Sequence, residues 1–413
     1  MSSTLIPSKW KSILLILFAI LGIAGFVSRG VYLVWRGVST SPSVPSLAGG
    51  DIAGDFLDAI SMGFCTLLLI PVIAYSGKLL AGGTVRPAAV RPIRLWQAAV
   101  LAAVWLGIAV IGTILTNSFD AGWEVLAVFF PLGVALPIVF LVWIALGGLQ
   151  TGSVRRLWAV FSLAMAGSTV LALLAEYLVI GAGALIGLAA LLSHPEWRGL
   201  VQQLQSQITH ATDMQTLVTE LAPYLTNPLV ILVVLAFAAG IGPLIEEAAK
   251  PAAIWLLGKS LRSPAEGFAL GVLCGAGFAL LEGVTATSGY SQLWGVGMAG
   301  RAASSLMHIM GSGLVGWGIA SARLEKRYLR LAGSYLGAVS LHGLWNGSVV
   351  LAVYGGLRWS LQKGQWDPTS IGFILIGAGL LALLFPVILV VLPVMNRLLR
   401  PAARAVEVPQ IDV

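Results

Sequence analysis

The sequence predicts an all-α fold in which about ten helices cross a membrane. Hydrophobic residues make up 58% of the 413 residues and charged residues only 10%, whereas soluble domains carry about 25% charged residues. The 49 glycines suit membrane helices, in which small residues let backbones approach closely. The third observation is a series of apolar runs, each close to the roughly 20 residues that span the hydrocarbon core.

The apolar runs define the predicted helices in order along the chain. The first follows Lys9 and Lys11 as a signal peptide would, but its apolar core is long and no small-residue cleavage site follows, so we expect an uncleaved span. Ten spans are expected near residues 12–35, 56–80, 95–116, 125–148, 157–192, 229–258, 265–288, 298–320, 331–356 and 370–396.

The basic residues predict the orientation of these spans. If the N-terminus lies inside, 17 of the 24 Lys and Arg residues fall in inner segments, as retention of positive charge on the cytoplasmic side requires. We therefore expect both termini to be cytoplasmic. The net charge of +7 is explained by these loops, so the expected partner is a lipid bilayer and not a nucleic acid.

The spans group into four regions. Residues 1–192 form an N-terminal five-helix membrane region, and residues 193–228 form an extracytoplasmic segment with the apolar spacing of an amphipathic helix. Residues 229–396 form a second membrane region that carries most of the polar groups, and residues 397–413 form a cytoplasmic tail. Function is therefore expected in the second membrane region.

The sixth span contains an unusual group of charges, Glu246, Glu247 and Lys250. A charged side chain at the bilayer centre costs on the order of 2.5–3.5 kcal/mol. Either carboxylate can meet the ammonium on one helix face, since the spacings are four and three residues. Pro251 removes a hydrogen bond and displaces the carbonyl of Glu247, which predicts a bent helix beside a polar cavity. A buried ion pair that locks two helices is the structural alternative.

The next three spans carry polar residues at similar depth. Glu282 lies in the seventh span, His308 in the eighth, and His342 and Asn346 on one face of the ninth. Counted from the inner ends, Glu246, His308 and His342 are each about 17–18 Å into the membrane at about 1.5 Å per residue. Glu282 is about 8 Å further out. The four helices are therefore expected to surround one polar cavity.

Such a cavity is suited to hydrolysis of an amide. A carboxylate can take a proton from water and return it to a leaving amine. Imidazole and carboxamide groups can orient the water or stabilise an oxyanion. Carboxylate and imidazole are also zinc ligands, so a metal-bound water is an alternative. No serine or cysteine beside a histidine stands out as a nucleophile.

Taken together, the motifs resemble those of a known family, the PrsW-type intramembrane proteases, which are distant relatives of the CAAX prenyl proteases and Abi proteins. The resemblance covers roughly residues 229–356 and rests on Glu246-Glu247-x-x-Lys250, Phe278-x-x-x-Glu282, His308 before a glycine-rich turn, and His342-x-x-x-Asn346. Glu282 departs from the CAAX branch, which has histidine there. The resemblance implies a multi-pass protein of a prokaryotic plasma membrane that cleaves membrane-anchored proteins such as anti-sigma factors.

The resemblance also implies roles for the site residues. Glu246 activates the water and Glu247 supports it, while Lys250 holds both glutamates in register. His308, His342 and Asn346 orient water or bind the oxyanion, Glu282 completes the catalytic set, and Arg301 supports it. No cofactor is required on the preferred interpretation. If zinc is present, its expected ligands are Glu246, His308 and His342.

Two other functions remain open on the sequence. An ion- or proton-coupled transporter with two five-helix repeats would also bury carboxylates. Such a repeat predicts matching polar segments in both halves, yet Glu176 is the sole carboxylate well inside a span of the first half. The other alternative is a non-catalytic membrane scaffold that keeps a protease-like pocket for binding.

Overall fold

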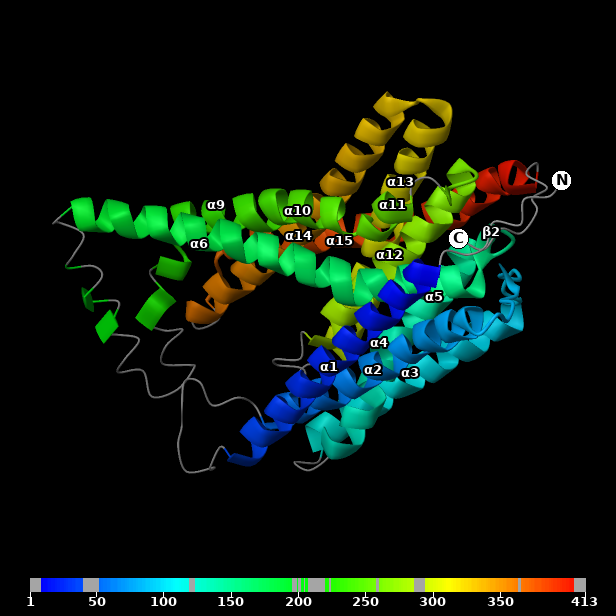
Figure 1. The fold of residues 1–413 in the computed structure, drawn as a ribbon. Helices are drawn as coiled ribbons and strands as arrows, with labels where there is room; N and C mark the ends of the chain where they lie inside the picture. Colours follow the sequence, from blue (N-terminus) through cyan, green and yellow to red (C-terminus); the bar gives the residue numbers. More distant parts are fainter. Residues whose placement is uncertain are drawn as a thin grey trace.

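The chain folds into a bundle of long helices, known here from a computed structural model (Figure 1). The structure describes residues 9–39, 52–118, 123–194, 199, 202–203, 205–206, 220–222, 224–257, 260–285, 294–362 and 365–404. The segment 193–228, expected to be an amphipathic helix, lies largely outside the described residues. The tail 397–413 is described only to residue 404.

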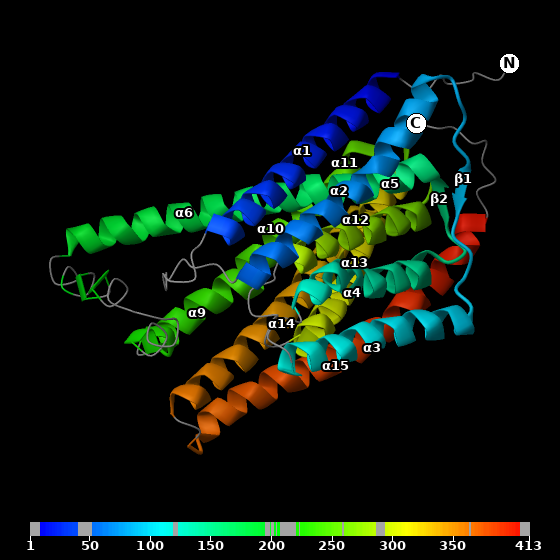
Figure 2. The ribbon, with the colours of Figure 1, turned by 90° about the horizontal axis from the view of Figure 1, so that it is seen from below.

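The N-terminal half supplies five of the expected spans. The first four are single helices: α1 (Lys9–Ser39), α2 (Ile52–Leu80), α3 (Leu95–Ser118) and α4 (Trp123–Leu146). The fifth is continuous through three pieces: α5 (Val154–Ser162), a π-helical turn η1 (Leu163–Ser168) and α6 (Thr169–Ser193). In Figures 1 and 2, α6 extends away from the other helices of this half, and many of its large apolar side chains are exposed.

The C-terminal half supplies the other five. The sixth span is divided into α9 (Pro228–Ala236), a π-helical turn η2 (Phe237–Ile241), α10 (Gly242–Ala249) and α11 (Ala252–Leu257). The remaining spans are α12 (Pro264–Thr285), α13 (Trp294–Glu325), α14 (Tyr328–Leu361) and α15 (Pro368–Arg404). Every expected span is therefore helical over most of the residues that the structure describes.

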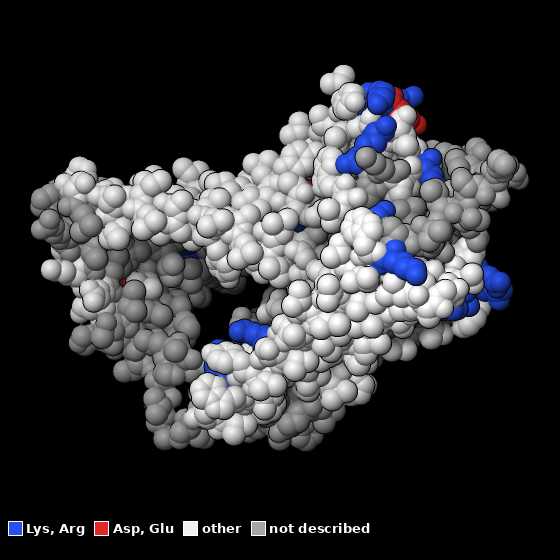
Figure 3. Space-filling model, viewed as in Figure 1, with Lys and Arg blue, Asp and Glu red and all other residues white. Residues whose placement is uncertain are grey.

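A polytopic helical membrane protein is confirmed. Within the described residues, nine helical stretches are long and apolar enough to cross a membrane. The tenth expected span is α13, which has the length but contains Arg301 and His308 in a sequence rich in glycine and serine. These residues lower the mean hydropathy of α13. Helix α13 tolerates them because it packs between α12 and α14 and faces other helices more than lipid. In Figure 3, Lys and Arg gather near helix ends, and the helix flanks are largely uncharged.

Helix α12 is the centre of the bundle, since 94% of its apolar window is buried inside the protein. Its glycines allow α13 to approach backbone to backbone. A Cβ atom on Gly271 would lie 2.2 Å from the carbonyl oxygen of Ser312, and one on Gly275 would lie 2.3 Å from that of His308. Any side chain larger than a hydrogen atom at these positions would therefore push apart α12 and α13, which carry part of the site.

A small sheet adds to the all-α bundle. Strand β1 (Pro87–Ala89) pairs antiparallel with β2 (Gln150–Ser153), with Pro87 opposite Ser153 and Ala89 opposite Gln150. Strands of three and four residues are too short to show an alternating pattern in the sequence. The sheet joins two loops at one end of the bundle, directly before α5.

The orientation of the chain in the membrane and the division into four regions stay predictions. The fold does place the helices of the second membrane region together, and it adds α6 and η1 of the first region to them: α10 contacts α6, and η1 contacts α12.

Candidate active site

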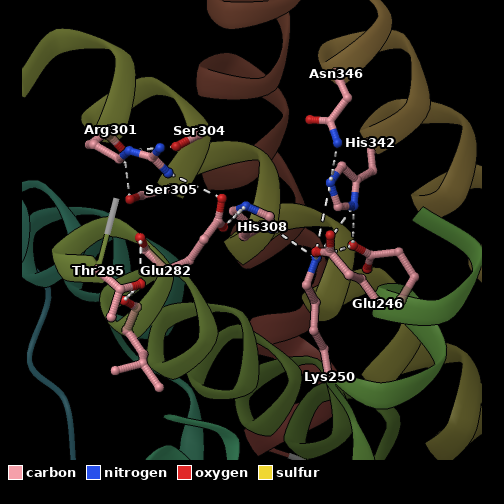
Figure 4. A network of polar contacts seen from close by, with 12 residues as sticks. Glu246, Lys250, Glu282, Thr285, Arg301, Ser304, Ser305, His308, His342 and Asn346 are labelled. Atoms are coloured by element: carbon pink, nitrogen blue, oxygen red, sulfur yellow. Dashed lines mark hydrogen bonds and ion pairs between the residues drawn. The ribbon is translucent and has the colours of Figure 1, made fainter. Parts of the chain in front are cut away.

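The polar residues of four helices form one connected cluster inside the bundle (Figure 4). Helix α10 contributes Glu246 and Glu247, and Lys250 follows it directly as the C-cap residue. Helix α12 contributes Glu282, α13 contributes His308, and α14 contributes His342 and Asn346. Figure 4 shows Glu246, Lys250, His308 and His342 pointing toward one another, with Glu282 lying between His308 and Arg301.

The Lys250 ammonium lies at the centre of the cluster and is fully buried. Its Nζ is 2.6 Å from Glu247 Oε1 and 3.0 Å from Glu246 Oε2. The same nitrogen is 2.8 Å from His308 Nδ1 and 3.4 Å from His342 Nδ1. The ring of Phe278 covers another side of the ammonium. Nζ lies 4.4 Å from the ring centroid, which is a cation–π contact. Lys250 therefore contacts both glutamates and both histidines, which is more than the ion pair that its spacing predicts.

The two glutamates differ in access. The Glu247 side chain is 0% exposed, and it accepts from Lys250 and from His342 Nδ1 at 3.0 Å. The Glu246 side chain is 16% exposed. Its Oε2 atom is buried and has no hydrogen-bond partner of acceptable geometry among the described residues. Glu246 is thus the glutamate that water can reach, and Glu247 is the one held by the protein.

The tautomer of His342 follows from its partners. Asn346 Nδ2 lies 3.1 Å from His342 Nε2. An amide nitrogen only donates, so Nε2 is the acceptor and Nδ1 carries the proton that is donated to Glu247. Asn346 Nδ2 also donates to the carbonyl of Ala238 at 3.1 Å. One amide hydrogen of Asn346 therefore orients His342, and the other joins α14 to η2.

His308 has the opposite tautomer. Its Nε2 is 2.7 Å from Glu282 Oε2, and a carboxylate accepts, so Nε2 carries the proton. Its Nδ1 accepts from Lys250. Glu282 continues the network to Arg301, with Oε1 3.1 Å from Nη1. These two side chains are 39% and 24% exposed, so the cluster opens toward the Thr285 end of α12.

Local irregularities of the sixth span position the cluster. The turn η2 includes Ala238, whose carbonyl accepts from Asn346. A Cβ atom on Gly343 would lie 2.2 Å from the carbonyl oxygen of Ala239, so glycine lets α14 approach this turn. The expected bend is a break between Ala249 and Ala252, and Ser168 of η1 donates to the freed carbonyl of Lys250 at 3.2 Å. Such π-helical turns occur often at functional sites.

The structure adds one residue that the motifs do not contain. Glu176 of α6 lies near Glu246, and its Oε1 would lie 3.7 Å from a Cβ atom on Gly242. The sequence signal was available, because a lone carboxylate inside an apolar span is costly and therefore marks a site.

The comparison with known families identifies the chain. A model described as PrsW family intramembrane metalloprotease matches residues 153–392, which is more than half of the sequence. The chain belongs to the PrsW family. The match begins at the residue before α5 and ends in α15, so it covers the whole polar cluster, Glu176 included. No curated protein and no solved structure matches the chain.

The family description implies a metal ion, and the donor set suits one by type. Glu246, His308 and His342 each offer a ligand atom, and the three atoms lie within 4.8 Å of one another. Two ligands of one zinc ion are at most about 4.2 Å apart, since Zn–N and Zn–O distances are about 2.0–2.1 Å. In addition, the lone pairs that a metal ion would need are already used. Lys250 contacts Glu246 Oε2 and donates to the lone pair of His308 Nδ1, and Asn346 donates to the lone pair of His342 Nε2. In this arrangement the residues do not fit a metal ion.

Proposed function

We propose that this PrsW-family protein is an intramembrane endopeptidase that hydrolyses a peptide bond of a membrane-anchored protein with water activated by Glu246. The observation that carries the proposal is the cluster in which Lys250 joins two glutamates and two histidines inside the region of the family match. The family is described as a protease family, which favours proteolysis over transport and over a binding scaffold.

The proposed reaction begins at Glu246. Its carboxylate takes a proton from a water molecule while the water oxygen attacks the carbonyl carbon of the substrate. The tetrahedral intermediate then collapses, the C–N bond breaks, and the proton held by Glu246 passes to the nitrogen of the leaving amine. Glu246 returns to its ionised state, and the products are a new carboxyl group and a new amine.

The other residues prepare this step. Glu247 and Lys250 fix Glu246 through the ion pair and keep a positive charge beside it. Asn346 and His342 hold Glu247 in turn. Arg301 is the most exposed cation of the cluster, at 24% of its side chain, and so it supplies positive charge where an oxyanion can form.

A peptide bond must reach the cluster from water or from a gap between helices, because extended backbone is not tolerated in lipid. Exposure rises from 0% at Glu247 through 16% at Glu246 to 39% at Glu282. This gradient supports entry from the Thr285 end of α12, which the predicted topology places on the outer face. By resemblance, the substrates are anti-sigma-factor-like proteins in the plasma membrane of a prokaryote.

The test compares Glu246→Gln with the wild type. Membranes of cells that produce each protein are analysed for new N-termini of membrane proteins, and candidate substrates are then cleaved by purified protein in H₂¹⁸O. We expect one ¹⁸O atom in the new carboxyl group and a loss of several orders of magnitude for Glu246→Gln. Glu325→Gln, at an exposed ion pair with Arg327, is the matched control. Cleavage by Glu246→Gln at the wild-type rate would contradict the assignment.

A further inference from the structure

The surroundings of Lys250 Nζ have the composition of a cation site. Three acceptor atoms lie within 3.0 Å of the nitrogen: Glu247 Oε1, His308 Nδ1 and Glu246 Oε2. Their number matches the three hydrogens that an ammonium can donate. His342 Nδ1 follows at 3.4 Å, and Phe278 covers the remaining side. Two carboxylate oxygens and two imidazole nitrogens therefore surround one point.

The same four atoms would be the ligands of a divalent ion at that point. Their distances of 2.6–3.4 Å to Nζ exceed zinc–nitrogen and zinc–oxygen distances of about 2.0–2.2 Å by roughly 0.5–1.3 Å, so a contraction of the cluster would complete the coordination. A metal ion and an ammonium cannot share the position, however, because both are cations and both need the same lone pairs. The choice between them is decided by the residue at position 250.

We propose that the Lys250 ammonium takes the place of a divalent metal ion in this site, and that removal of Lys250 converts the site into a divalent-metal site. The ligands of the vacated site are Glu246, His308 and His342, with Glu247 as a fourth. His342 binds the metal ion through Nδ1 once its proton has moved to Nε2. The Nε2–H group then donates to Asn346 Oδ1, after the Asn346 amide has rotated so that Oδ1 faces the ring. The proposal concerns metal binding alone and does not depend on the proposed proteolytic activity.

Two variants test the conversion. Lys250→Ala removes the ammonium, and Lys250→Ala with Glu247→Gln also removes one negative charge, so that the net charge of the buried cluster is unchanged. Each protein is purified in detergent, freed of metal and titrated with Co²⁺, whose visible spectrum reports tetrahedral coordination by nitrogen and oxygen. Bound cobalt per chain is measured by elemental analysis.

We expect one cobalt ion per chain in both variants, with an affinity at least about tenfold above that of the wild type, because the repelling charge at the same point is gone. Addition of His308→Ala should abolish the spectrum. Asn396→Ala, at a side chain that bonds to the carbonyls of Ala145 and Gly147 and to Arg400 Nε, should leave cobalt binding as it is in each background.

Three results would overturn the proposal. One is a wild-type protein that binds one cobalt ion with a spectrum that His308→Ala abolishes. Another is a folded Lys250 variant that binds no more cobalt than the wild type. The last is a Lys250 variant that fails to fold even when cobalt or zinc is supplied during expression, because metal should fill and stabilise a vacated site. A variant that folds only with added metal would support it.

Discussion

Asn346 Nδ2 donates to His342 Nε2 across one turn of α14 and to the carbonyl of Ala238 in η2. One amide group thus fixes the tautomer of a buried histidine and joins α14 to the irregular turn that precedes Glu246. Through His342 Nδ1 and Glu247 Oε1, 3.0 Å apart, the orientation of Asn346 reaches the Lys250 ammonium. The HxxxN motif therefore acts on the glutamates.

Asn346→Ala should lower proteolytic activity by about 10–100-fold, the usual effect of losing a group that orients an active-site histidine. The matched control is Asn396→Ala. The Asn396 amide also donates twice, to the carbonyls of Ala145 and Gly147, and the residue is 1% exposed, but it lies outside the cluster. Both variants should lose about 1–3 kcal/mol of stability for the unpaired groups. Equal loss of kcat in the two variants would show that Asn346 acts only on stability.

Glu176 lies near Glu246, and we expect a hydrogen bond between the two carboxyl groups. Two carboxyl groups can form such a bond only if one of them carries a proton. The amide of Gln donates permanently, so Glu176→Gln should keep most of the activity, whereas Glu176→Leu should lose it by about 10-fold or more. Rates are measured on the substrate found with Glu246→Gln. If Gln and Leu have the same effect, the hydrogen bond is not the reason that Glu176 lies there.

The ten helices could be predicted from the sequence because a bilayer requires apolar runs of a fixed length. The convergence of Glu246, His308 and His342 was also predictable, since helices of known rise that start at a common membrane face bring residues of equal depth together. Glu282, expected about 8 Å further out, contacts His308 directly.

The contacts that depend on helix rotation and on neighbours could not be predicted. Spacing places Lys250 near Glu246 and Glu247 but does not indicate that the ammonium also contacts His308 and His342. The π-helical turns η1 and η2 leave no mark in an apolar sequence, because they insert a residue without changing hydropathy. The contact of Glu176 with Glu246 depends on the packing of α6 against α10, which no motif encodes.

Gly275→Ala should test how closely α12 and α13 must approach. A Cβ atom on Gly275 would lie 2.3 Å from the His308 carbonyl oxygen, whereas one on Gly379 of α15 would meet nothing within 4 Å. Gly275→Ala should therefore cost about 1–3 kcal/mol or more and displace His308, with loss of activity. Gly379→Ala should stabilise by about 0.5–1 kcal/mol, the usual gain in a helix interior. Thermal unfolding in detergent and cleavage assays distinguish the two.

The last prediction concerns the ion pair between Arg156 of α5 and Glu266 of α12. Arg156 Nη1 lies 3.0 Å from Glu266 Oε1, and the side chains are only 7% and 4% exposed. Arg156 Nη1 also donates to the carbonyl of Ser260, and Glu266 Oε2 accepts from the backbone N–H of Arg262. The pair therefore joins α5 to the loop before α12, at the end of the bundle remote from the exposed Glu282.

Either Arg156→Met or Glu266→Gln should destabilise the protein by about 3–5 kcal/mol, because each leaves a buried group without its partner. The double variant should lose less than the sum of the two, since it leaves neither charge unpaired, and the coupling should be about 0.5–3 kcal/mol. Unfolding in detergent measures all four proteins of this cycle. The folded fraction of each variant should keep the wild-type kcat, because neither residue contacts the cluster around Lys250. Additive effects of the two substitutions would mean that the ion pair contributes nothing and that each side chain acts through its other contacts.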